Sequence, residues 1–209
     1  MPKTEKDKKI KALLFDLGKV IVDFDFTPAF QRLSRHCKLK PKEIGDTFSR
    51  SGLEVLYDGG KISSFQFYRQ VKKVVRHNLS FSEFKNVWNE IFTLNLETAR
   101  ILQNTKDRYR LVLISNTNAM HFDYVRARYS PLKHFDRFVL SYREKVRKPD
   151  PRIYEKAARA CRANPNEILY IDDREDLTQA ADALGFYTFT YKKNTKDLLS
   201  RMKSLGVRC

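Results

Sequence analysis

Four short polar segments carry side chains of the types that bind anions and hard metal ions. Asp16 and Asp172-Asp173 each directly follow an apolar run, Ser115-Asn116 close a third run, and Lys148 precedes a proline. Carboxylates that lie close together can hold Mg²⁺ through hard oxygen ligands. A lysine ammonium, a serine hydroxyl and an asparagine amide instead suit the oxygens of a phosphoryl group. Together the segments predict an anion-binding site that also has ligands for a divalent cation.

Apolar segments of strand length position these residues. Each is short and nearly continuous, as in strands that are buried on both faces of a parallel sheet. The four segments are Ile10–Phe15, Arg110–Ser115, Glu167–Asp172 and Gly185–Thr190. Helical patterns separate them, so we predict an α/β fold with a Rossmann-like parallel sheet. Ligands of such sheets bind beyond the carboxyl ends of the strands, which is where the polar segments lie.

Between the first and second apolar segments the pattern changes to helical periodicity. Prolines or capping residues mark four helix starts, at Thr27-Pro28, Pro41, Ser63 and Ser80–Glu83. The last of these has the serine and glutamate spacing of a capping box. We therefore predict an all-helical cap at residues 27–97, inserted into an α/β core that is formed by residues 1–26 and 98–209.

The composition favours a soluble protein that acts on small molecules. The 209 residues are 42% hydrophobic, which is enough for a full core, and we expect neither a signal peptide nor a membrane span. Three cysteines, far apart and without metal-ligand spacing, favour a reducing compartment, so we expect a cytoplasmic protein. The formal net charge of +16 is diffuse and accompanies no nucleic-acid-binding motif, so we expect it to attract small anions rather than nucleic acid. No feature predicts an oligomeric state.

The polar segments also resemble the four motifs of the haloacid dehalogenase (HAD) superfamily, in the same order and over essentially the whole chain. Phe15–Val20 is similar to motif I, Ile114–Asn118 to motif II, Arg147–Tyr154 to motif III, and Tyr170–Asp173 with Ala180–Gly185 to motif IV. The helical insertion after motif I resembles the cap of subfamily I. Within that subfamily the chain resembles bacterial sugar phosphatases of the glucose-1-phosphatase kind.

This resemblance implies a Mg²⁺-dependent phosphatase that hydrolyses a small phosphorylated metabolite, such as a sugar phosphate. Asp16 would attack phosphorus and form an aspartyl phosphate, which water then hydrolyses. Ser115 and the backbone of Asn116 would bind the transferring phosphoryl group, and Lys148 would offset the negative charge gathered there. Cap side chains would select the substrate, and the sequence does not reveal their direction.

The same resemblance implies a metal site. Mg²⁺ would bind the carboxylates of Asp16 and Asp173 and the backbone carbonyl of Gly18. Asp172 would lie beside the ion, either as a further ligand or as a partner of the ligands.

Gly18 departs from the family pattern, because most phosphatases of the superfamily carry at this position an aspartate that protonates the leaving oxygen. Losing a general acid typically costs about 10²- to 10⁴-fold in rate, so three alternatives are open. The leaving group needs little protonation, or another group supplies the proton, or the reaction is not phosphoryl transfer. Asp23 and Asp25 lie on one face of an alternating segment. Either of them, or water, is a candidate for the group that supplies the proton. The third includes metal-independent 2-haloacid dehalogenation and a non-catalytic binding protein.

Overall fold

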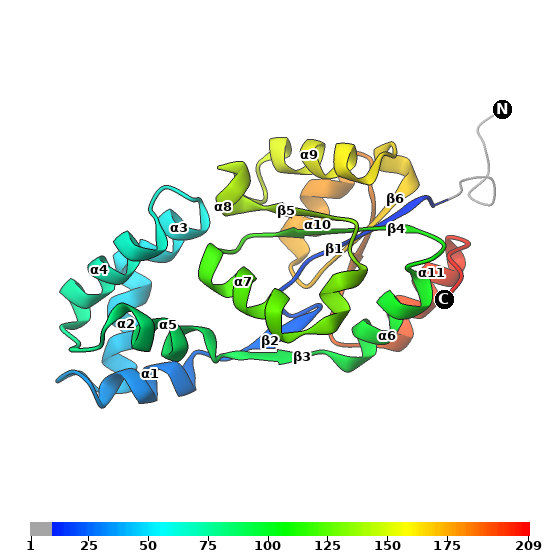
Figure 1. Ribbon diagram of the computed structural model, residues 1–209. Coiled ribbons are helices and arrows are strands. Elements are labelled where there is room, and N and C mark those ends of the chain that lie inside the picture. The colour runs from blue at the N-terminus through cyan, green and yellow to red at the C-terminus, as the bar shows by residue number, and fades with distance from the viewer. Residues whose placement is uncertain (1–9) are drawn as a thin grey trace.

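The structure, a computed structural model that describes residues 10–209, is built on a five-stranded parallel sheet (Figure 1). The strand order is β5-β4-β1-β6-β7, and all four pairings are parallel. The strands are β1 (Ala12–Phe15), β4 (Arg110–Ser115), β5 (Arg137–Leu140), β6 (Ile168–Asp172) and β7 (Tyr187–Thr190). The predicted α/β fold is confirmed, whereas β5 was not among the predicted strands.

Helices cover both faces of the sheet. On β1, Leu13 and Phe15 pack in one cluster with α6, α7 and α11, while Ala12 and Leu14 pack in another with α9 and α10. All four side chains are fully buried, which explains why this strand is a continuous apolar run. The helices outside the insertion are α6 (Leu96–Thr105), α7 (Ala119–Arg128), α8 (Ser141–Glu144), α9 (Pro151–Cys161), α10 (Glu175–Asp182) and α11 (Thr195–Ser204), with 3₁₀ turns at Ser130–His134 and Pro165–Glu167. Within residues 10–209, no helix has both the length and the apolar character to cross a membrane.

The predicted helical insertion lies between β1 and β4, and Figure 1 shows its helices gathered beyond one end of the sheet. Ser63 and Ser80 cap α4 and α5 as expected, each through a capping box. Phe67, Phe84 and Trp88 pack together and give the insertion an aromatic core of its own. The helices are α1 (Thr27–Ser34), α2 (Pro41–Ser51), α3 (Leu53–Asp58), α4 (Ser64–Val75) and α5 (Phe81–Asn89).

A two-stranded antiparallel ribbon joins the insertion to the core. It consists of β2 (Val22–Phe24) and β3 (Phe92–Leu94), with Asp23 opposite Thr93. No strand was predicted at β3, where helical periodicity was expected. Three residues are too few to show an alternating pattern, so the pairing with β2 rather than local sequence makes this segment a strand.

A buried serine fastens the end of α3 to the sheet. Ser141 accepts a hydrogen bond from the Thr117 backbone amide at 3.0 Å and donates one to the Asp58 carbonyl at 2.5 Å. Ser141 has no exposed surface, so water cannot take the place of either bond. We call these contacts the serine latch, because they tie α3 of the insertion to the loop that follows β4.

Replacing Ser141 by alanine removes both bonds and leaves the buried Thr117 amide without this partner. An unsatisfied buried donor costs about 1–3 kcal/mol, so we expect Ser141→Ala to lower the free energy of unfolding in urea by that amount. The matched control is Ser204→Ala, since the Ser204 hydroxyl bonds the Arg201 carbonyl on an exposed face of α11. The control should change stability by less than about 0.5 kcal/mol. Equal effects of the two substitutions would contradict the latch.

Candidate active site

The carboxyl ends of β1, β4 and β6 meet at one edge of the sheet, because β1 pairs in parallel with both neighbours. Asp16, Ser115 and Asp172 therefore emerge at the same edge, although they are far apart in the sequence. One carboxylate oxygen from each of Asp16, Asp172 and Asp173 lies within 4.8 Å of the others. Asp172 is fully buried, Asp16 is 8% exposed and Asp173 is partly exposed. We call these three residues the acidic cluster.

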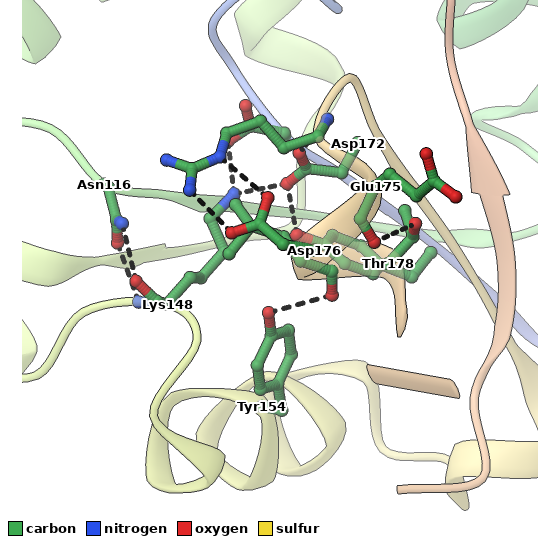
Figure 2. Close-up of polar contacts among 11 residues, drawn as sticks. Asn116, Lys148, Tyr154, Asp172, Glu175, Asp176 and Thr178 are labelled. Atoms are coloured by element: carbon green, nitrogen blue, oxygen red, sulfur yellow. Dashed lines mark hydrogen bonds and ion pairs between the residues drawn. The ribbon is translucent and has the colours of Figure 1, made fainter. Parts of the chain in front are cut away.

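Lys148 enters from the loop before α9 and bridges two of these carboxylates. Its ammonium donates to Asp16 Oδ1 at 2.7 Å and to Asp172 Oδ2 at 2.6 Å. The Asn116 side chain accepts a hydrogen bond from the Lys148 backbone amide at 2.8 Å and donates one to its carbonyl at 2.9 Å (Figure 2). The Asn116 side chain thus positions the lysine, a role that the sequence did not reveal.

Burial and charge act against each other in the acidic cluster. Burial raises the pKa of Asp16 to about 7, with Lys148 opposing the rise and Asp172 adding to it. Burial works against the charge on Lys148, but the two carboxylates outweigh it and raise the pKa of the ammonium. Tyr170 donates its hydroxyl hydrogen to Asp172, and burial next to that carboxylate raises the pKa of the hydroxyl. Lys148 faces three carboxylates, so the cluster retains negative charge that favours a further cation.

Two adjoining cavities open beside the acidic cluster. The larger, of about 200 Å³, contains Asp16, and we call it the Asp16 cavity. The smaller, of about 70 Å³, is lined by Phe26, Phe92 and His121, and we call it the aromatic cavity. Residues of both the core and the insertion line the two cavities together: Gly18, Phe24, Glu54, Asp58, Ser115 and Asn116.

The structure brings the predicted site residues together. Six of them line the Asp16 cavity: Asp16, Gly18, Ser115, Asn116, Lys148 and Asp173. The seventh, Asp172, contacts Lys148 from a fully buried position.

Two further carboxylates, Glu54 and Asp58, face both cavities from α3. They are four residues apart, which places them on one side of a helix. Asp58 is 5% exposed, and its Oδ1 accepts a hydrogen bond from Asn118 Nδ2 at 3.0 Å. The sequence offered only the four-residue spacing as a signal, and solvated helices have the same spacing, so both residues were missed.

The environment of Asp58 changes its acidity. Burial raises the pKa of Asp58 to about 6, while the hydrogen bond from Asn118 and the charge of Arg147 oppose the rise. Neighbouring residues also displace water from the carboxyl of Glu54 and raise its pKa, against the same arginine, although the residue as a whole is exposed. Burial lowers the pKa of His121 to about 4, so its ring is neutral near pH 7 and one ring nitrogen can accept from Asn118 Nδ2, 3.1 Å away.

Asp23 and Asp25 point away from the cavities. Asp25 accepts a hydrogen bond from the Thr27 backbone amide at 2.8 Å at the start of α1, and Asp23 pairs with Lys193 at 2.9 Å. Phe24, which lies between them in the sequence, lines both cavities. The sequence showed the alternation along this segment, but Phe24, and not the aspartates, lies on the face toward the cavities. Neither aspartate is placed to supply the missing acid.

A comparison with protein families identifies the family of this chain. Residues 10–185 match the family described as haloacid dehalogenase-like hydrolase. The chain belongs to the haloacid dehalogenase-like hydrolases. The superfamily that the four motifs predicted is thereby confirmed for this HAD-like hydrolase.

Relatives of this HAD-like hydrolase resemble it over most of its length. A D-ribitol-5-phosphate phosphatase from Bacteroides thetaiotaomicron is 27% identical over 187 residues, which cover 86% of this chain and 91% of the relative. A HAD family enzyme from the same bacterium, solved in complex with magnesium and inorganic phosphate, is 26% identical with a TM-score of 0.79 over 88% of this chain and 94% of that chain. A HAD-like family hydrolase from Porphyromonas gingivalis has a TM-score of 0.78 at 21% identity, over 93% and 98% of the two chains, and shows the shared fold.

This HAD-like hydrolase should depend on Lys148 for stability. Lys148→Met leaves Asp16 and Asp172 buried without their ammonium partner, and breaking a buried pair in this way typically costs about 3–5 kcal/mol. We expect that loss in the free energy of unfolding, measured by urea denaturation at pH 7 without divalent metal. Lys193→Met is the control, because its ion pair with Asp23 is exposed and should contribute less than about 1 kcal/mol. If Lys148→Met lowered the free energy of unfolding no more than the control does, the Lys148 ammonium would not offset the negative charge of the acidic cluster.

Proposed function

We propose that this protein is a Mg²⁺-dependent phosphatase that hydrolyses a small phosphorylated metabolite through an aspartyl-phosphate intermediate. The observation that carries the proposal is the bridge from Lys148 to Asp16 and Asp172, beside Ser115 and Asn116 in one cavity. A carboxylate nucleophile, a fixed ammonium and neutral hydrogen-bond donors suit phosphoryl transfer. The relative named D-ribitol-5-phosphate phosphatase supports the reaction class.

The acidic cluster has a donor set that fits a divalent cation. Its three carboxylate oxygens lie within 4.8 Å of one another, and hard oxygen ligands suit Mg²⁺. Asp16, Asp173 and the Gly18 carbonyl would hold the ion, with Asp172 beside it. When bound, the ion would neutralise negative charge on the phosphoryl oxygens and on the carboxylates. The relative solved with magnesium and inorganic phosphate supports this choice of metal.

The proposed reaction transfers the phosphoryl group to Asp16 and then to water. In the first step an Asp16 oxygen attacks phosphorus, the bond to the leaving oxygen breaks, and that oxygen takes up a proton. In the second step water attacks the aspartyl phosphate and gives up a proton, and phosphate leaves with Asp16 restored. Ser115 and the Asn116 backbone hold the phosphoryl oxygens, and Lys148 offsets the charge that gathers on them.

The aromatic cavity supports a hydroxylated, uncharged leaving group. It offers ring surface from three phenylalanines, and the carboxylates of Glu54 and Asp58 can accept hydrogen bonds from hydroxyl groups. Among residues 10–209, no lysine or arginine lines it, whereas four line the Asp16 cavity: Lys19, Arg147, Lys148 and Arg174. A sugar or polyol therefore fits this cavity better than a second phosphate.

The insertion supports the finer classification. Its position between β1 and β4 supports subfamily I, and we retain residues 27–97 as the cap and residues 1–26 with 98–209 as the core. The cavity chemistry supports a sugar phosphatase of the glucose-1-phosphatase kind. Ribitol 5-phosphate and glucose 1-phosphate are therefore the first substrates to test.

A phosphate-release screen tests the proposed function. We expect the wild type to release phosphate from at least one sugar or polyol phosphate with Mg²⁺, and to stop when EDTA removes the metal. Asp16→Asn should lose activity by a factor on the order of 10³ or more, because the nucleophile is removed. Asp123→Asn is the matched control, since Asp123 is exposed on α7, and it should retain the wild-type rate.

Three results would reject this function. The first is no release from any ester in the screen, and the second is release that persists in Asp16→Asn or in EDTA. The third is chloride release from 2-chloropropionate without metal, which would instead identify a dehalogenase.

A further inference from the structure

Position 18 carries no acid for the leaving oxygen, and the Phe24 ring lies close beside it. A Cβ atom at Gly18 would lie 3.0 Å from Phe24 Cε1, so a side chain there would require the ring to shift. Lys19 fixes this ring, because its ammonium donates to the Phe24 carbonyl at 2.8 Å and lies 4.4 Å from the ring centroid. A proton for the leaving oxygen must therefore come from another residue or from water.

Two carboxylates outside the acidic cluster line both cavities, and they differ in how firmly they are held. Glu54 is exposed, whereas Asp58 is 5% exposed and hydrogen-bonded to Asn118 at 3.0 Å. The serine latch also fixes the backbone of Asp58 through its carbonyl. A general acid must be held at a constant place beside the leaving oxygen, which favours Asp58.

We propose that Asp58, carried by α3 of the insertion, is the general acid and base that replaces the residue missing at Gly18. This inference rests on the proposed phosphatase function. In the first step the Asp58 carboxylic acid gives its proton to the leaving oxygen as the phosphorus–oxygen bond breaks, which yields an alcohol and the Asp58 carboxylate. In the second step that carboxylate takes a proton from the attacking water as the bond between phosphorus and Asp16 breaks. One water is consumed, and one alcohol and one phosphate are released.

The groups around Asp58 suit both of its protonation states. Burial raises the pKa of its carboxyl from the usual 3.8 to about 6, so the acid form persists closer to neutral pH than in an exposed aspartate. Glu54, on the same helix, adds to the rise. Arg147 Nη2 lies 3.9 Å from Asp58 Oδ2 and stabilises the carboxylate that the first step produces. His121, which contacts Asn118, is neutral near pH 7 because burial lowers its pKa to about 4.

The dependence on the leaving group tests the assignment. The probes are ribitol 5-phosphate, whose alkoxide must be protonated, and p-nitrophenyl phosphate, whose phenolate leaves without a proton. We expect Asp58→Asn to lower kcat/KM for the first by about 10²- to 10⁴-fold and for the second by less than about 10-fold. Neither kcat/KM value includes a step after the aspartyl phosphate forms. The ratio of one variant's kcat/KM values for the two esters also does not depend on the fraction of folded enzyme.

Glu54→Gln is the comparison variant, because Glu54 lines the same cavities and the amide oxygen of glutamine can still accept a hydrogen bond from a hydroxyl group. The ratio of its kcat/KM values for the two esters should stay within about 10-fold of the wild-type ratio. Equal losses on both esters in Asp58→Asn would assign Asp58 a structural role and overturn the inference, while Asp16-dependent release by the wild type would still support the phosphatase. Leaving-group dependence in Glu54→Gln in place of Asp58→Asn would also overturn it. Failure of the wild type on every phosphate ester would reject the phosphatase and this inference together.

The pH profile provides a second readout. Only the acid form of Asp58 can protonate the leaving oxygen, so wild-type kcat/KM for ribitol 5-phosphate should fall as pH rises through the pKa of Asp58, about 6. Asp58→Asn should lack this descending limb. A descending limb with the same midpoint in the wild type and in Asp58→Asn would show that another group supplies the proton.

Discussion

The site depends on the balance of charge at the carboxyl edge of the sheet. Pairing of β1 with β6 brings Asp16, Asp172 and Asp173 within 4.8 Å of one another. Two like charges 4 Å apart repel by about 4 kcal/mol at an effective dielectric constant of 20, so these carboxylates stay ionised together only beside cations. The ammonium of Lys148 offsets part of this repulsion, and the Asn116 side chain holds the Lys148 backbone through two hydrogen bonds. The charge that remains favours a divalent cation and, with it, a phosphoryl group.

Much of this edge was predictable from local sequence. A strand buried on both faces must be apolar throughout, so the polar residue that ends it stands out, as Asp16, Ser115 and Asp172 do. Parallel strands then bring such ends to one edge without any knowledge of side-chain packing. β5 was missed because its edge position leaves Arg137 exposed and Phe138 only partly buried, which weakens the apolar signal.

The parts that the sequence did not predict depend on how the insertion packs against the core. Along β2 the alternation correctly separated Asp23 and Asp25 from Phe24, but nothing local says which face turns inward. Pairing of β2 with β3 sets that direction, and a shift by one residue would reverse it. The serine latch holds the end of α3, and with it Asp58, through a bond between Asp58 and Ser141, which are 83 positions apart. The periodic pattern of apolar residues in a sequence does not reveal such long-range contacts.

A proton donor on α3 ties the chemistry to the packing of the insertion. The pKa of Asp58 is about 6 because the residue is buried between α3 and the start of α7. In solvent the pKa of the carboxyl would return toward its usual 3.8, and the fraction in the acid form at pH 7 would fall from about a tenth to less than about a thousandth. An acid at position 18 would belong to the core and would need no such contact. With glycine at that position, the proposed donor has its raised pKa only where the insertion packs against the core, so the element that would enclose the leaving group would also set the supply of protons.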